Sequence, residues 1–417
     1  MMMRSVSVLW VVLGCARPTP PAVIAKPAPA KPAPAKPTLA EEVLEIEALI
    51  LPTEPGSKQF LRAPSSDVRR RLATEAPTLA ALPEPDRAEK TLASIEAVLI
   101  DHHFVYPGVG YVAAFHDGVT EVTVDELGKA TLLARSENAS QARQQMIKRS
   151  STFHIADCDI YSLLYVSLGE ELGLPISMVD LPDGPAGGVA HNYVVWRLAD
   201  GNLVRWEADA GEMRTEFSDQ YHYDATTELT RERAQQLHIS AVPMTRDEVL
   251  GYVHWAVGLT WSDRGVDHLT LEAYERALSM WTSPKVLNSI AWLLATSPNP
   301  KLRDSKRAIA YGEKLAELWP TASFLDTVAA AYAAAGRWAD AVAMQRRAKK
   351  AANDKERASF DERLTMFERC QPYYEARANE RSASSMRGAL TDSGWGKLQI
   401  DNWKPSPVKV ELANRCP

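Results

Sequence analysis

Cysteine, clusters of basic residues and long apolar runs are all scarce in this chain of 417 residues. Four cysteines are too few for a scaffold built on disulfides, a class of domain that is dense in cysteine. The net charge of −6, without any Lys/Arg block, argues against a nucleic-acid partner. No stretch of 18 apolar residues follows the N-terminal region, so no later segment is expected to span a membrane. With 46% hydrophobic and 24% charged residues, the composition indicates two or three folded domains.

Proline is unevenly distributed, because eight of the 27 prolines fall between Pro18 and Pro37. Lys-Pro-Ala-Pro-Ala units repeat there, and proline favours the extended polyproline II conformation, so residues 16–39 are predicted to form a stiff linker. Before the linker, Arg4 precedes the apolar run 6–13, which is too short to cross a bilayer. This arrangement is typical of an export signal, and we expect residues 1–15 to be a signal peptide.

The expected signal peptide ends in Val12-Leu13-Gly14-Cys15, which resembles the lipobox of bacterial lipoproteins. In that family the small residue precedes the cleavage site, and the cysteine becomes the lipid-bearing first residue of the mature protein. The resemblance implies that Cys15 carries a lipid and that the chain contacts the membrane through it. It also implies a lipid-anchored location in the cell envelope, either in the periplasm or at the outer membrane. The alternative is an ordinary secretory signal with a chance cysteine.

Residues 40–105 show helical spacing of apolar residues, and a further helix is predicted to begin at Cys158. Asp157 is a suitable N-cap, and Gly173 and Pro175 would end the helix. One apolar stripe runs along it, formed by Ile160, Leu163, Leu164, Leu168 and Leu172. Cys158 therefore lies in the first turn, where the helix dipole favours a thiolate. The flanking Asp157 and Asp159 oppose that effect, so a nearby histidine would have to supply positive charge.

The segment after this helix offers such a histidine. Residues 190–198 are aromatic and β-branched, which predicts a strand that begins near His191, and a second strand returns over 202–207. A three-residue turn that ends at Gly201 would place Glu207 diagonal to His191 on one face of the hairpin. The same register places Asp209 directly opposite His191, so Asp209 is the rival acid.

The order of cysteine on a helix, histidine on a strand and acid on the next strand resembles the papain-type, transglutaminase-like superfamily. The similarity is greatest to a bacterial group in which such domains are joined to tetratricopeptide repeats. It covers roughly residues 85–230 and is carried by His191-Asn192-Tyr193-Val194-Val195-Trp196 and Asp200-Gly201…Trp206-Glu207. The resemblance implies that Cys158, His191 and Glu207 form a catalytic triad that acts on an amide bond. Two departures are a glutamate in place of the usual aspartate, and the absence of glutamine among residues 152–157. His154 is an alternative oxyanion donor, although we expect it to be a structural residue.

Uninterrupted helices are predicted from Thr245, where Thr245 and Glu248 fit a capping box. Residues 322–355 match the 34-residue tetratricopeptide pattern, an earlier unit runs through Ala291 and Ala308, and residues 246–283 could form a third pair. Such repeats either present a concave surface for a protein or peptide partner or support the preceding domain. In the tail, Cys416 could form a disulfide with Cys370.

The sequence thus predicts an α+β fold with a transglutaminase-like domain over 40–235, tetratricopeptide-like helices over 245–370 and a tail over 371–417. The expected function is that of an exported, lipid-anchored cysteine hydrolase or acyltransferase without cofactor or metal. A zinc site formed by His154, Cys158 and His191 is disfavoured, because no CxxC or HExxH motif accompanies it. The rival hypothesis is a catalytically inactive scaffold that binds proteins in the envelope.

Overall fold

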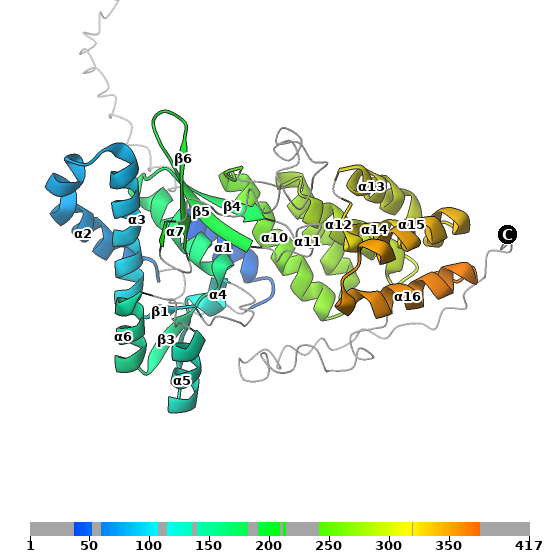
Figure 1. Ribbon diagram of the computed structural model, residues 1–417, viewed down its shortest axis with the longest axis horizontal. Coiled ribbons are helices and arrows are strands. Elements are labelled where there is room, and N and C mark those ends of the chain that lie inside the picture. The colour runs from blue at the N-terminus through cyan, green and yellow to red at the C-terminus, as the bar shows by residue number, and fades with distance from the viewer. Residues whose placement is uncertain are drawn as a thin grey trace, which may run out of the picture. The chain divides into compact units, whose positions relative to one another are not determined.

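Helices and two small sheets make up the first part of the described chain, and helices alone make up the second (Figure 1). The computed structural model describes residues 37–51, 60–106, 115–135, 140–181, 191–208, 212–213, 242–318 and 320–375. The expected signal peptide and all but the end of the expected linker lie outside these residues. Leu39, the last residue of that linker in our prediction, instead begins helix α1 (Leu39–Glu47) and is buried.

Helices α1 to α4 form the N-terminal part of the described chain. Thr38 caps α1 in a capping box with Glu41, which satisfies backbone N–H groups at the helix start. The other three are α2 (Arg62–Ala80), α3 (Glu84–Asp101) and the short α4 (Phe115–Gly118). The helical prediction for residues 40–105 is therefore confirmed over most of the described part of that range, whereas Phe104 and Val105 form a short strand.

The first sheet has the strand order β1-β3-β2, with β1 (Phe104–Val105) parallel to β3 (Thr152–Ile155). Strand β2 (Glu121–Thr123) pairs antiparallel with β3 and is exposed along its length. Helices α5 (Glu126–Arg135) and α6 (Gln141–Arg149) connect β2 to β3. Because β3 ends three residues before Cys158, this sheet fixes where the next helix begins.

Helix α7 (Cys158–Leu172) begins and ends as the sequence predicts. The Asp157 side chain accepts a hydrogen bond from the Ile160 N–H, and Gly173 adopts the left-handed conformation with φ 68° that closes the last turn. The apolar stripe of α7 is buried against strands β4 and β5 from Ile160 to Leu168. This packing fixes the N-terminus of α7, and with it Cys158, relative to the second sheet.

The second sheet is antiparallel with the order β4-β5-β6-β7. Its strands are β4 (Ile176–Leu181), β5 (His191–Arg197), β6 (Leu203–Glu207) and β7 (Glu212–Met213). The predicted hairpin register is confirmed, since Arg197 pairs with Leu203 and the Leu198 N–H donates to the Asn202 carbonyl. Gly201 has φ 88°, the left-handed conformation that the three-residue turn requires.

Residues 242–375 form successive helical hairpins followed by one further helix (Figure 1). The pairs are α10 (Arg246–Asp263) with α11 (Asp267–Met280), α12 (Pro284–Thr296) with α13 (Ser305–Leu318), and α14 (Ala322–Ala334) with α15 (Trp338–Ala351), and α16 (Asp354–Glu368) follows. The predicted capping box of Thr245 and Glu248 begins α10. Ala329 and Ala348, two of the small residues in the repeat pattern, are fully buried, as close helix packing requires.

The helical hairpins pack directly on the second sheet and on α7. The Met244 N–H donates to the Met178 carbonyl of β4, and Arg246 forms ion pairs with Glu42 of α1 and Glu170 of α7 at 2.6 and 2.7 Å. One continuous apolar core extends from Leu39 to Phe367. The described residues from Pro37 onward therefore belong to one compact unit.

The protein is of mixed α and β structure and is mostly helical. Among the described residues, no helix combines the length and apolar character needed to cross a bilayer. The first residues of the predicted tail pack against α12, where the Tyr373 ring lies 5.7 Å from that of Trp292 and the Glu375 N–H donates to the Thr296 carbonyl. Residues 376–417 lie outside the described part of the chain.

Candidate functional site

Cys158 occupies the first turn of α7 and its side chain is half-buried. Its thiol donates to Oδ1 of Asp159 at a sulfur–oxygen distance of 3.4 Å. Cys158 takes part in no disulfide, as a nucleophile requires. The sequence indicated that Asp159 opposes thiolate formation, and the structure places this carboxylate in direct contact with the sulfur.

His191 and Glu207 form a hydrogen bond, with His191 Nε2 2.7 Å from Glu207 Oε2. The confirmed register explains this contact, because Glu207 lies opposite Tyr193 and therefore diagonal to His191. The Glu207 side chain is only 5% exposed, so the carboxylate is held in a largely dry environment, whereas His191 is 21% exposed and reaches solvent. Asp209, the rival acid, lies outside the described residues.

Side chains alternate along β5, and the two faces of this strand have different neighbours. Asn192, Val194 and Trp196 point toward α7, since the latter two pack in the core that α7 enters and Asn192 contacts Asp159. Tyr193 and Val195 lie on the other face, where they pack with β4. As the first residue of β5, His191 begins on this second face, together with Glu207.

Asp159 of α7, Asn192 of β5 and Tyr252 of α10 form a hydrogen-bonded triangle that the sequence did not reveal. Asn192 Nδ2 donates to Asp159 Oδ1 and, at 3.0 Å, to the Tyr252 hydroxyl, while that hydroxyl donates to Asp159 Oδ2 at 2.5 Å. Asn192 and Tyr252 are buried. The triangle holds the first turn of α7 against the start of β5. Cys158 directly precedes Asp159 in the sequence, and His191 directly precedes Asn192, so the Asp159–Asn192 hydrogen bond joins the neighbours of both predicted catalytic residues.

A buried ion pair lies beside the triangle. Lys285 of α12 binds Asp180 of β4 at 2.5 Å, and its side chain is only 11% exposed. The Lys285 ammonium group also lies over the rings of Trp255 and Tyr252, at 5.4 and 5.9 Å from their centres. Asp180 pairs with Asn192 in the sheet register, so this contact joins the helical hairpins to the strand pair that carries the site.

His154, the alternative oxyanion donor, is placed in an aromatic cluster. Its ring is stacked on Phe104 at 4.7 Å and lies 5.0 Å from the ring of Phe60. Burial lowers the pKa of the imidazole, which is the expected effect of an apolar environment on a cationic form. Within the part of the chain that the structure describes, no group of three or more His, Cys, Asp or Glu residues is arranged to hold a metal ion.

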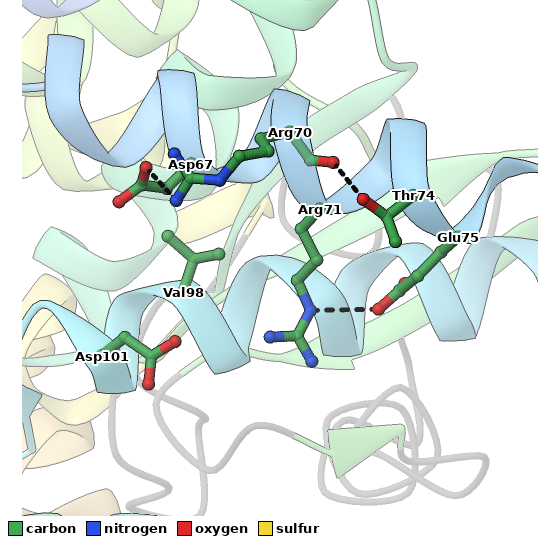
Figure 2. Close-up of a pocket in the computed structure, with 7 residues that line it drawn as sticks. All are labelled: Asp67, Arg70, Arg71, Thr74, Glu75, Val98 and Asp101. Atoms are coloured by element: carbon green, nitrogen blue, oxygen red, sulfur yellow. Dashed lines mark hydrogen bonds and ion pairs between the residues drawn. The ribbon is translucent and has the colours of Figure 1, made fainter.

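One surface hollow in the described part of the chain is lined by none of these residues. It has a volume of about 310 Å³ between α2 and α3, and Figure 2 shows that its arginines face carboxylates of the same helix. Arg70 binds Asp67 at 2.7 Å, and Arg71 binds Glu75 at 3.1 Å. A second hollow of about 390 Å³ is lined by residues of α1, α2, α4 and α7, among which Cys158 is not found. Both hollows are therefore separate from the predicted site.

Of the other cysteines, only Cys370 lies among the described residues. Cys15, the predicted lipid attachment residue, and Cys416 lie outside the described residues. Cys370 follows α16 and is disulfide-bonded, while its predicted partner Cys416 is not among the described residues.

Comparisons of the chain with protein-family models, with curated proteins and with solved structures find no match.

Proposed function

We propose that the protein is a cysteine hydrolase or acyltransferase that acts on an amide bond in a peptide or another component of the cell envelope. The observation that carries the proposal is the 2.7 Å hydrogen bond between His191 and Glu207. The residue after His191 is Asn192, which binds Asp159 in the first turn of the helix that begins at Cys158. Histidine oriented by a buried acid, near a cysteine in the first turn of a helix, is the arrangement of groups that activates a thiol.

In the proposed reaction, the Cys158 sulfur attacks the carbonyl carbon, and His191 takes the thiol proton. Because Nε2 of His191 binds Glu207, Nδ1 is the nitrogen assigned to this proton. His191 then gives the proton to the leaving amine, and a thioester to Cys158 remains. Water or a second amine attacks the thioester and loses a proton to His191, which yields an acid or a new amide and restores the thiol.

Two further parts of the site are assigned in this proposal. The backbone N–H of Cys158, at the positive end of α7, donates to the developing oxyanion. The proposed proton transfer requires the His191 imidazole, at the first residue of β5, to reach the thiol around the end of the strand. Glu207 stabilises the imidazolium that forms during each proton transfer.

The finer description of the fold is also part of the proposal. Residues 40–235 form a transglutaminase-like domain, and the helical hairpins over 245–370 are tetratricopeptide-like units that bind a peptide or protein partner. The hairpin register that joins His191 to Glu207 supports the first assignment, and the buried alanines at the repeat positions support the second. Lipidation at Cys15 and an envelope location rest on the sequence of residues 1–37.

The proposed nucleophile is tested by acyl transfer from p-nitrophenyl acetate, a simple activated ester. Attack by the Cys158 thiolate releases p-nitrophenolate and leaves one acetyl group on the sulfur. We expect a burst of one p-nitrophenolate per chain in the wild type and no burst in Cys158→Ala. Peptide mapping by mass spectrometry should place the acetyl group on Cys158. An equal burst in both proteins, or acetyl groups found only on other residues, would contradict the proposal.

A second candidate function is favoured by one observation, the contact between the Cys158 thiol and the Asp159 carboxylate. A carboxylate next to a thiol stabilises its protonated, unreactive form. In this alternative the first domain is an inactive scaffold, and the protein serves as an adaptor that binds other envelope proteins through its helical hairpins. The adaptor would show no burst with p-nitrophenyl acetate, so the same experiment separates the two functions.

A further inference from the structure

The helical hairpins supply one side chain to the surroundings of the proposed nucleophile. Tyr252 lies on α10, in the first hairpin, yet its hydroxyl binds Asp159 Oδ2 at 2.5 Å and accepts from Asn192 at 3.0 Å. It is 4% exposed, and its ring packs against those of Trp255 and Trp281, at 5.6 and 5.7 Å between ring centres. This packing leaves the hydroxyl little freedom to leave the carboxylate.

Asp159 connects this tyrosine to the thiol. Its Oδ1 accepts from both the Cys158 thiol and Asn192, while its Oδ2 accepts from Tyr252. Two buried donors therefore fix the position of the carboxylate, and the carboxylate in turn orients the sulfur. The two donors also draw negative charge away from the oxygen that faces Cys158, which weakens the repulsion between this carboxylate and a thiolate.

We propose that Tyr252 is a positioning residue for Cys158 and that it acts through Asp159. The reactivity of the thiol would then depend on the docking of the helical hairpins. This inference rests on the proposed function, because it concerns the same nucleophile. The contact also gives the hairpins a role beyond partner binding, since any movement of α10 away from α7 would remove the tyrosine from Asp159.

The chemistry of Tyr252 suits this role. Burial raises the pKa of its hydroxyl well above the ordinary value, and the carboxylates of Asp159 and Asp180 raise it further. The hydroxyl therefore stays protonated over the whole range in which a thiol titrates, and it remains a hydrogen-bond donor to Asp159. Cys158 also contributes to this pKa, which indicates that the phenol and the thiol lie within electrostatic range of one another.

Several charged and titratable groups lie on the elements packed around the start of α7. They are Asp157 and Asp159 of α7, Asp180 of β4, His191 of β5, Glu207 of β6, Tyr252 of α10 and Lys285 of α12. Lys285 binds Asp180, and Glu207 binds His191, so most of these charges are compensated within the cluster. Asp159 is the carboxylate in contact with the sulfur, and its effect on thiolate formation is expected to be the largest.

The experiment measures the rate of alkylation of Cys158 by iodoacetamide from pH 5 to pH 10, quantified on the Cys158 peptide so that other thiols do not contribute. Tyr252→Phe keeps the packed ring and removes the donor. Asn192 still holds Asp159 next to the sulfur, and the carboxylate then carries more uncompensated charge. The midpoint of the profile should therefore rise by about half a pH unit. In Asp159→Asn the negative charge is absent, and the midpoint should fall by about one unit.

The double variant Asp159→Asn/Tyr252→Phe tests whether the tyrosine acts through the aspartate. Its midpoint should equal that of Asp159→Asn alone, since the Tyr252 effect requires the charge. Tyr332→Phe is the matched control, because it removes a tyrosine hydroxyl of α14 that binds a carboxylate, Glu313 of α13, at 2.8 Å between the two following hairpins. The control should leave the Cys158 profile unchanged.

The inference would be overturned if Tyr252→Phe leaves the midpoint unchanged or lowers it, or if its shift persists in the double variant. If Tyr252→Phe does not fold, Asp159→Asn decides, since an unchanged midpoint in that variant removes the link between Asp159 and the thiol. Failure of the proposed function has a different signature. In that case His191→Ala has no effect on alkylation, whatever the result for Tyr252.

Discussion

Replacement of His191 by alanine is expected to slow acetyl transfer from p-nitrophenyl acetate to Cys158 by at least about a hundredfold at pH 7. Without the imidazole, no group oriented by Glu207 accepts the thiol proton, and the neighbouring Asp159 keeps the sulfur protonated. The rate is measured from the burst of p-nitrophenolate. Added imidazole should restore part of the rate, because it can replace the missing general base.

His102→Ala is the matched control for this experiment. His102 also binds a carboxylate, Asp67, at 3.0 Å, but it does so at the end of α3 and away from Cys158. Its removal should leave the burst unchanged. A burst in His191→Ala as fast as in the wild type would show that His191 does not act on Cys158, and the hydrogen bond to Glu207 would then be structural.

Replacement of Arg143 by methionine is expected to lower the free energy of unfolding by roughly 3–5 kcal/mol. Arg143 of α6 is 2% exposed and forms an ion pair with Glu96 of α3, which is 7% exposed. Its guanidinium also lies 5.2 Å from the centre of the Tyr161 ring. Methionine fills a similar volume but leaves the Glu96 carboxylate as a buried charge without its cation, which is the costly outcome. Urea unfolding followed by circular dichroism measures the change.

The double variant Arg143→Met/Glu96→Leu should recover most of this loss, because it removes both buried charges at once. Arg337→Met is the control, since Arg337 is 46% exposed and its ion pair with Asp340 lies at the surface. That variant should cost less than about 1 kcal/mol. If Arg143→Met were as mild as Arg337→Met, the Arg143–Glu96 pair would not contribute to holding α6 against α3.

The local features of the site were predictable because each depends on residues close in sequence. Asp157 caps α7, Gly173 ends it, and Gly201 sets the turn that brings Glu207 diagonal to His191. Capping and turn geometry act over two to four residues, so their signals are readable without knowledge of the fold. The capping box of Thr245 was predictable for the same reason.

The contacts between distant segments were not predictable. Tyr252 reaches Asp159 across 93 residues, and Lys285 reaches Asp180 across 105. Neither side chain differs in its local pattern from a tyrosine in an apolar helix face or a lysine near a helix start. Only the docking of α10 and α12 on the second sheet creates these pairs, and docking depends on the shape of both surfaces.

The sequence offered His154 as an alternative oxyanion donor and Asp209 as an alternative acid, and the outcomes for these two residues differ. For His154 the sequence favoured a structural role, and its ring indeed packs against those of Phe60 and Phe104, where burial lowers its pKa. The alternating pattern of β3 could not reveal these aromatic neighbours of His154, because Phe60 belongs to a segment that precedes β3 by more than ninety residues. Asp209, which lies outside the described residues, stays a prediction as the rival acid.

The central claim is that His191 activates the Cys158 thiol, and the most direct measurement is the pH profile of Cys158 alkylation in the wild type and in His191→Ala. We expect a wild-type midpoint more than about one unit below the 8.5 of an ordinary thiol, because the imidazolium stabilises the thiolate. In His191→Ala the midpoint should move to about 8.5 or above. Superimposable profiles, both with a midpoint at or above that of an ordinary thiol, would contradict the account.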